Sequence, residues 1–274
     1  MSLTDRPRGA RAFSLIELLV CISIIALLLS IALPGLRRGR EVARGAACLS
    51  NQRQLMLAWT VYANDYKDLA MPLAEWGGDE LGQQVFWWGT HGSATERVDY
   101  DRGFIAPYLS AALSARSVFE CPAQAWGTYR AQGPSREPTS TYGYNGYYLT
   151  PAKTPGWNLE IGFRPWRRLF EIREPSTLFV FADAMLPGNP VRNCALLDPP
   201  QVYLSGSWRI NNSPTTSFRH GRPAGGVGNA ATARADGSVQ TVAGIPAWVS
   251  PATAIGSVGT RNDPHYVPDA MEWP

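Results

Sequence analysis

The sequence predicts an α+β protein, in which one long amino-terminal helix packs on an antiparallel β-sheet with an enlarged, loop-rich head. Residues 13–33 form a long apolar run with a single charge, and residues 36–66 continue it with helical spacing. From Lys67 onward most of the 22 prolines and 26 glycines separate short aromatic or β-branched runs. We therefore expect helix first, then strands and loops.

The composition bounds the class of protein. Of 274 residues, 45% are apolar and 17% are charged, so the chain can bury a core. The net charge of +3 is too small for a typical nucleic-acid-binding protein, and we expect no nucleic-acid partner. Residues 1–44 hold seven arginines against three acids. Because these arginines flank the apolar run, we interpret them as a signal of membrane topology.

The apolar run is long enough to cross a bilayer. Its 21 residues span roughly 31 Å as a helix. A cleavable secretory signal has a shorter apolar stretch of about 7 to 15 residues and ends at an Ala-x-Ala-like site. This run ends instead in Pro34-Gly35, so we predict a membrane-spanning helix.

One carboxylate, Glu17, lies inside this run, where it costs on the order of 2.5 to 3.5 kcal/mol. The stretch Arg11-Ala12-Phe13-Ser14-Leu15-Ile16-Glu17 resembles the signal of type IV prepilins and type II secretion pseudopilins. The resemblance implies that a prepilin peptidase cuts between Ala12 and Phe13 and methylates the new amino terminus of Phe13. The family usually has glycine before the cut, whereas this chain has Ala12.

The same resemblance implies a role for Glu17 in assembly. Its carboxylate would meet the amino terminus of a neighbouring subunit's Phe13, so that two groups costly in lipid neutralise each other. Pro34 falls where many pilins have a helix-kinking proline. The alternative interpretation is an uncleaved signal anchor with an incidental glutamate.

The resemblance also implies a domain organisation and a function. Residues 1–12 would be a cytoplasmic leader, residues 13–34 the transmembrane helix, residues 35–66 its amphipathic continuation and residues 67–274 an exported, β-rich head. The protein would span the inner membrane once, with a periplasmic head. It would be a structural, non-enzymatic pseudopilin or minor pilin of a type II secretion or type IV pilus-like assembly. Its partners would be the prepilin peptidase, other pilin or pseudopilin subunits and an inner-membrane assembly platform.

The amphipathic segment is expected to lie against the head, because it carries an apolar stripe of Val42, Ala46, Leu49, Met56, Trp59 and Tyr62. This segment and several pieces of the head resemble large-headed bacterial prepilin-like proteins that share a late His and Asp-Gly. The pieces in this chain are Phe119-Glu120-Cys121-Pro122, residues 140–145, residues 174–177, residues 181–184, Arg219-His220-Gly221 and residues 235–239.

Short runs in the head predict its elements. The Asp236-Gly237 pair predicts a hairpin with a type I′ turn. A short helix is expected over residues 104–115, and surface loops over residues 131–138 and 187–200. Strands are expected over residues 84–88, 141–149, 177–182, 202–210, 229–235 and 238–243.

His220, Asp183 and Asp236 are the candidates for a metal or acid–base cluster. No pair of them has a recognised ligand spacing, and the turn explains Asp236, so we favour a structural interpretation and expect no cofactor. The resemblance adds one option, because major pseudopilins bind calcium in a late loop; Asp183 and Asp236 are the candidate ligands. An enzymatic head using His220 with either aspartate ranks last.

Tryptophans suggest a second function, in which a membrane-anchored head binds a ligand such as a glycan at the cell surface. Scattered tryptophans more often fill a core built from short strands, so we favour packing. Those considered are Trp76, Trp87, Trp88, Trp126, Trp157, Trp166 and Trp208.

The cysteines differ in compartment. Cys21 lies within the apolar run, whereas Cys48, Cys121 and Cys194 would face an oxidising compartment after export. At most one pair forms among these three within one chain. Cys48 with Cys121, and Cys121 with Cys194, both remain open.

Overall fold

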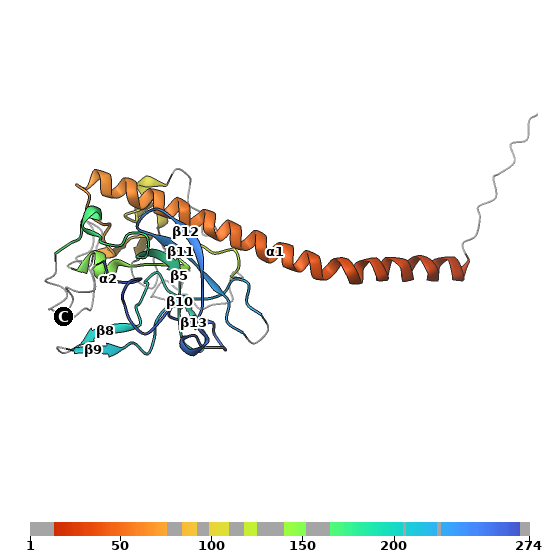
Figure 1. Cartoon of the computed structure of the whole chain (residues 1–274). Coiled ribbons are helices and arrows are strands. Elements are labelled where there is room, and N and C mark those ends of the chain that lie inside the picture. Colours follow the sequence, from red (N-terminus) through yellow and green to blue (C-terminus); the bar gives the residue numbers. More distant parts are fainter. Residues whose placement is uncertain are drawn as a thin grey trace, which may run out of the picture. The chain divides into compact units, whose positions relative to one another are not determined.

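The computed structural model describes residues 14–75, 84–91, 99–109, 118–124, 140–151, 165–204, 207–223 and 226–268. The chain forms two compact units, Met1–Val42 and Ala43–Pro274. A long amino-terminal helix is followed by antiparallel sheets, as the predicted α+β class requires (Figure 1). The predicted loop at residues 131–138 lies outside the described residues.

Helix α1 comprises Leu15–Asp65, so the apolar run and the amphipathic segment form one continuous helix. Pro34 lies inside it. Within the second unit, the buried face of α1 repeats at intervals of three or four residues, the spacing of one helix face. It consists of Cys48, Gln52, Leu55, Met56, Ala58, Trp59, Tyr62 and Ala63.

The predicted stripe on α1 is partly wrong. Met56, Trp59 and Tyr62 are buried, but Val42 is 73% exposed and Ala46 is exposed too. Burial begins only at Cys48, because that is where α1 first packs against the buried side chains of the head.

The central sheet has four antiparallel strands in the order β12-β11-β5-β4. These are β4 (Tyr142–Tyr144), β5 (Phe179–Asp183), β11 (Asn229–Arg234) and β12 (Val239–Ala243). Every residue of β5 is buried, which explains its unbroken apolar sequence up to Asp183.

Aromatic side chains fill the space between α1 and this sheet. The indole of Trp59 on α1 donates to the hydroxyl of Tyr144 on β4 at 3.1 Å, and that hydroxyl donates to the carbonyl of Met71 at 2.6 Å. Trp87 packs against Phe181 with ring centroids 5.3 Å apart. Trp87 and Trp88 are thus core residues, as the packing interpretation expects. Trp76, Trp126 and Trp157 lie outside the described residues.

Smaller sheets surround this core. β1 (Ala74–Glu75), β2 (Gln84–Phe86) and β3 (Gly89–His91) form one antiparallel sheet. Three further antiparallel pairs are β6 (Met185–Leu186) with β7 (Arg192–Asn193), β8 (Gln201–Leu204) with β9 (Ser207–Ile210), and β10 (Thr216–Ser217) with β13 (Ile255–Gly256). Single 3-10 turns are Tyr100–Arg102, Ala106–Tyr108, Leu169–Glu171 and Pro246–Trp248.

Three predicted elements are replaced by shorter ones. The strand expected over residues 202–210 is the β8–β9 hairpin, and the one over residues 141–149 is β4 followed by the short helix α2 (Gly146–Leu149). In the described part of residues 104–115, the only helical piece is the 3-10 turn Ala106–Tyr108. Its proline near the amino end favours a tight turn.

The segment at residues 187–200 is not simply a surface loop. Cys194, Ala195 and Leu197 are buried. The segment pairs in parallel with β4 at Tyr144, whose N–H donates to the Ala195 carbonyl at 3.0 Å. It thereby covers the edge of the central sheet.

The Asp236-Gly237 hairpin is present, but its turn type was predicted wrongly. The N–H of Gly237 donates to the Arg234 carbonyl at 2.9 Å, so Ala235 and Asp236 occupy the two central positions of the turn. Of residues 235–237, only Gly237 has positive φ, at 85°. A type I′ turn needs positive φ at both central residues, whereas this geometry is that of a turn followed by a left-handed glycine.

Candidate functional site

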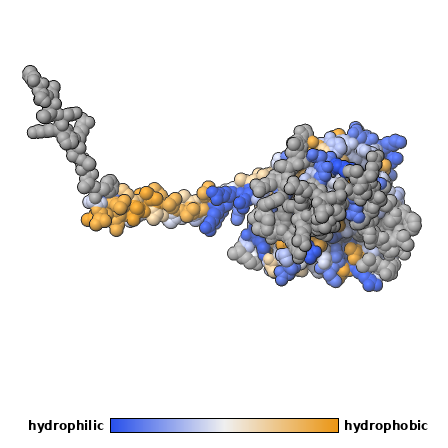
Figure 2. Space-filling model, turned by 180° about the vertical axis from the view of Figure 1, so that it is seen from behind, coloured by the Kyte–Doolittle hydropathy of each residue, from blue (hydrophilic) through white to orange (hydrophobic). Residues whose placement is uncertain are grey.

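The apolar part of α1 exposes its side chains. Leu15 is 86% exposed and Ile31 71%. This is the one helix among the described residues that is long and apolar enough to cross a membrane. Figure 2 shows its hydrophobic surface, followed along the helix by a hydrophilic band, which the sequence identifies with Arg37, Arg38, Arg40 and Arg44.

The polar groups of this apolar part are satisfied within the helix itself. The hydroxyls of Ser23 and Ser30 donate to the carbonyls of Leu19 and Leu27, each at 2.7 Å. A helix that pairs its own polar groups meets the main requirement for crossing hydrocarbon.

Glu17 closes a capping box at the start of α1. The Ser14 N–H donates to Glu17 Oε2 at 2.9 Å, and the Glu17 N–H donates to Ser14 Oγ at 3.2 Å. The box engages one carboxylate oxygen of Glu17. The predicted cleavage residues Ala12 and Phe13 lie outside the described residues.

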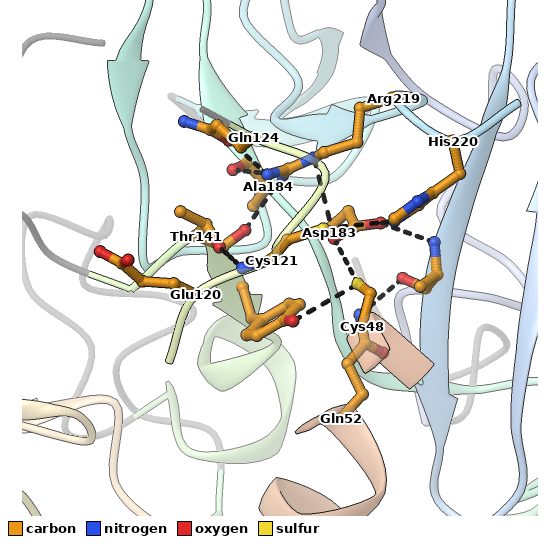
Figure 3. Close-up of polar contacts among 12 residues, drawn as sticks. Cys48, Gln52, Glu120, Cys121, Gln124, Thr141, Asp183, Ala184, Arg219 and His220 are labelled. Atoms are coloured by element: carbon orange, nitrogen blue, oxygen red, sulfur yellow. Dashed lines mark hydrogen bonds and ion pairs between the residues drawn. The ribbon is translucent and has the colours of Figure 1, made fainter. Parts of the chain in front are cut away.

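A buried cluster in the head is the second candidate site. It brings together Cys48 of α1, Cys121, Asp183 at the end of β5 and His220, whose ligand-type atoms all lie within 4.8 Å of one another (Figure 3). Their exposed fractions are 0%, 1%, 0% and 7%. Four segments far apart in the sequence thus converge on one point.

Asp183 is the hub of this cluster. Its Oδ1 accepts from the Cys48 thiol at 3.4 Å and lies 3.8 Å from Arg219 Nε. Its Oδ2 lies 2.9 Å from His220 Nε2 and accepts from the Ala231 N–H at 2.8 Å. Burial alone would raise the pKa of Asp183, but the adjacent Arg219 and His220 outweigh it and hold the pKa below its usual value.

His220 and Cys121 shift each other's protonation. Burial lowers the pKa of His220, but its contacts with Asp183 and Cys121 outweigh burial and raise the pKa to about 10. Burial raises the pKa of Cys121, whereas hydrogen bonds from Cys48 and His220 lower it to about 6. Burial raises the pKa of Cys48. Without a further ligand, the cluster therefore favours an imidazolium beside a thiolate, whose sulfur lies 3.3 Å from Nε2.

A surrounding set of hydrogen bonds fixes these side chains. Tyr142 OH donates to Cys48 Sγ at 3.4 Å, and the Cys121 N–H donates to Thr141 Oγ1 at 2.7 Å. Arg219 NH2 donates to the carbonyls of Thr141 and Ala184 at 3.1 and 3.0 Å, and NH1 donates to Gln124. The guanidinium is therefore held in place beside the carboxylate.

The cluster does not have the geometry of a Cys-His-Asp catalytic triad. In a triad the nucleophile and the carboxylate contact opposite nitrogens of the imidazole. Here Cys121 and Asp183 both contact Nε2 of His220, so all three converge on one side of the ring. The burial of Cys121 also leaves no room for a substrate at its sulfur.

The structure separates the remaining predicted residues from this cluster. Asp236 is on the β11–β12 turn, where its Oδ1 accepts from the N–H and hydroxyl of Ser238 at 2.9 and 2.6 Å. The turn thus accounts for Asp236. The Cys194 thiol donates to the Leu196 carbonyl at 3.4 Å and is not part of the cluster. The sequence left two cysteine pairings open, Cys48 with Cys121 and Cys121 with Cys194. In the structure the sulfurs of Cys48 and Cys121 lie in the same cluster.

Sequence reasoning found Asp183 and His220 but did not join them to the cysteines. In the sequence Cys48 and Cys121 stand out only as possible disulfide partners, because no short spacing links either to a histidine. One signal in the sequence could have indicated the cluster, namely the residue types on the buried face of α1. Cys48 and Gln52 interrupt an otherwise apolar helix face, one turn apart.

Comparison with known proteins identifies the amino-terminal segment. The family described as the prokaryotic N-terminal methylation motif matches residues 7–33. With the apolar helix, this match shows that the chain carries a type IV pilin-like prepilin signal. No curated protein and no solved structure matches the chain.

Proposed function

We propose that this chain is a structural, non-enzymatic subunit of a pilin-like assembly, processed by prepilin peptidase between Ala12 and Phe13. The observation that carries the proposal is the methylation-motif match over residues 7–33, at the start of an exposed apolar helix. The signal implies processing by a prepilin peptidase and assembly with other pilin subunits in general terms.

The position of Glu17 supports a role in subunit contact. In the capping box only Oε2 accepts the Ser14 N–H, and no described residue donates to Oε1. Cleavage before Phe13 creates a cationic amino terminus one residue from Ser14. Oε1 of one subunit is then available for the amino terminus of its neighbour, so both charges are neutralised inside the membrane.

The finer assignment is a pseudopilin or minor pilin of a type II secretion or type IV pilus-like machine. Its helix would span the inner membrane with the leader in the cytoplasm and the head in the periplasm. The large head supports a minor rather than a major subunit, because a bulky head limits how closely copies pack along a filament. An inner-membrane assembly platform would be the further partner.

Replacing Glu17 tests the assembly role. Glu17→Ala should leave cleavage intact but lower the yield of cross-linked or sheared multimers by roughly tenfold or more, because the neighbour's amino terminus loses its counter-charge. Glu41→Ala is the matched control, since Glu41 is an exposed glutamate on the same helix. Multimers at wild-type levels from cleaved Glu17→Ala protein would contradict the proposal.

A hollow on the head favours a second candidate function, the binding of a ligand such as a glycan. It has a volume of about 400 Å³. Trp248 and Ile210 line it and are 45% and 75% exposed, so an aromatic face is accessible for stacking on a sugar. Glycan-array binding by the full chain that is lost in Trp248→Ala, but kept in Phe170→Ala, would support this function. Phe170 is an exposed aromatic residue that does not line the hollow.

A further inference from the structure

We propose that Cys48, Cys121, Asp183 and His220 form a closed, structural site for a divalent zinc-type metal ion. The inference goes beyond the proposed function, because it concerns how the head is held together and stands whether or not the chain polymerises.

The residue types and their spacing fit zinc. Thiolate sulfur, imidazole nitrogen and carboxylate oxygen are all zinc ligands, with bonds of about 2.0 to 2.3 Å, and four of them form a tetrahedron around the ion. Tetrahedral bonds of that length place the ligand atoms roughly 3.3 to 3.8 Å apart. Cys48 Sγ lies 3.4 Å from Asp183 Oδ1, Cys121 Sγ lies 3.3 Å from His220 Nε2, and the whole set fits within 4.8 Å. Small side-chain shifts therefore suffice to admit the ion.

The charges also fit a buried divalent cation. Asp183 is already balanced by Arg219, whose Nε lies 3.8 Å from Oδ1. A zinc ion that displaces the thiol proton of Cys48 and the imidazolium proton of His220 is balanced by the Cys48 and Cys121 thiolates, with His220 neutral. The filled site then has no net charge, which is the condition for burying ions at acceptable cost.

The outer contacts are those expected of a metal centre. Metal ligands are normally oriented by hydrogen bonds from a second layer of residues. Here Tyr142 donates to Cys48, the Ala231 N–H donates to Asp183, and Arg219 is anchored on two backbone carbonyls. Four protein ligands leave no open coordination position, which is typical of structural rather than catalytic zinc.

The position of the site indicates what the ion does. Cys48 belongs to α1, and Asp183 ends β5 at the middle of the central sheet. His220 precedes β11, whose Asn229 pairs with it through two backbone hydrogen bonds. One ion would therefore cross-link the buried part of α1 to two strands and to the Cys121 segment.

A Cys48–Cys121 disulfide is the competing state in an oxidising compartment. A disulfide needs only the two sulfurs and gives no reason for Asp183 and His220 to point at them. The two sulfurs contact each other, but each also has an oxygen or nitrogen partner, Cys48 with Asp183 and Cys121 with His220. This arrangement favours the metal.

The test is the metal content of the full-length chain, purified in detergent after expression with Zn²⁺ and without chelator. Elemental analysis should find one zinc per chain in the wild type and in Cys194→Ser, whose buried thiol lies outside the cluster. Cys121→Ser and His220→Gln should lower the zinc content roughly tenfold or more. Replacing zinc by Co²⁺ should give the absorption of a tetrahedral, thiolate-bound ion in the wild type and in Cys194→Ser, but not in Cys121→Ser or His220→Gln.

A wild-type measurement guards against variants that fail to fold. A strong chelator should lower the Tm of the wild type, and added Zn²⁺ should restore it, because the ion binds only the folded state. Cys121→Ser should not respond to either. Wild-type chain that contains no zinc with both thiols free, or that carries a Cys48–Cys121 disulfide despite expression with Zn²⁺, overturns the proposal.

Discussion

The two parts of helix α1 differ in where their apolar side chains lie. From Leu15 to Leu33 the helix is apolar all round and exposes its leucines and isoleucines, whereas between Cys48 and Ala63 it buries one face against the head. The first pattern is suited to hydrocarbon, the second to a protein core.

The polar groups of the two parts differ in how far along the sequence their hydrogen-bond partners lie. Ser14, Ser23 and Ser30 find partners within four residues along the chain. In the second part, Gln52 donates to the carbonyl of Ala231 and Trp59 to the hydroxyl of Tyr144, both far away in sequence. Local sequence therefore determines the chemistry of the first part, and the tertiary fold determines that of the second.

The largest expected effect concerns the leader. Ala12→Trp should abolish processing, because the prepilin signal has a small residue before the cut, while Ala10→Trp leaves processing intact. Gel mobility with co-expressed peptidase separates the two. Equal cleavage of both variants would mean that the cut does not lie between Ala12 and Phe13.

Truncating the central side chain of the buried part comes next. Trp59→Ala removes a fully buried indole and its hydrogen bond to Tyr144, and should lower the free energy of unfolding of the head by about 3 to 5 kcal/mol. Leu27→Ala, in the exposed apolar part, should change it by less than about 0.5 kcal/mol. Urea unfolding of the detergent-solubilised chain measures both changes in the free energy of unfolding. Equal changes in the two variants would contradict the proposed difference between the two parts of α1.

A half-buried carboxyl, that of Asp198, gives the head a pH dependence. Burial raises the pKa of Asp198 to about 6, partly offset by a hydrogen bond from Tyr147. The folded state therefore binds the proton more tightly, and the free energy of unfolding falls as pH rises from about 4 to about 6. Asp198→Asn should remove about 2 kcal/mol of this fall, whereas the exposed Asp101→Asn should not. Identical pH profiles for wild type and Asp198→Asn would refute this assignment.

The smallest expected effect concerns a buried hydrogen bond between residues far apart in the sequence. Gln52→Ala removes the donor to the buried Ala231 carbonyl and should cost about 1 to 2 kcal/mol. Asn51 provides the comparison, because it is only half-buried and donates to the Glu120 carbonyl. Asn51→Ala should cost less, and the reverse order in chemical denaturation would contradict the burial argument.

The sequence predicted what depends on neighbouring residues and missed what depends on distant ones. The apolar run, the long helix and the strands around Phe181 and Ala231 were all visible as periodicity or as β-branched and aromatic runs. The turn at Gly237 was found, but its type depends on the φ of Asp236, which two letters do not determine.

The buried cluster shows the limit most clearly. Cys48, Cys121, Asp183 and His220 come from four separate segments, and no short ligand spacing connects them. Only the packing of α1 on the sheet brings Cys48 to Asp183. The prediction of a surface loop over residues 187–200 was wrong for the same reason. Prolines mark turns, but they do not reveal that Leu197 pairs with the edge of β4.

The central claim is that the chain is a prepilin whose mature form begins at Phe13. The most direct test is the intact mass and amino-terminal sequence of the membrane-extracted protein, produced with and without a prepilin peptidase. With the peptidase, the account predicts a chain beginning at N-methylated Phe13; without it, the leader remains. A chain that keeps Arg11-Ala12 in the presence of active peptidase, or one cut after residue 30, would contradict the account.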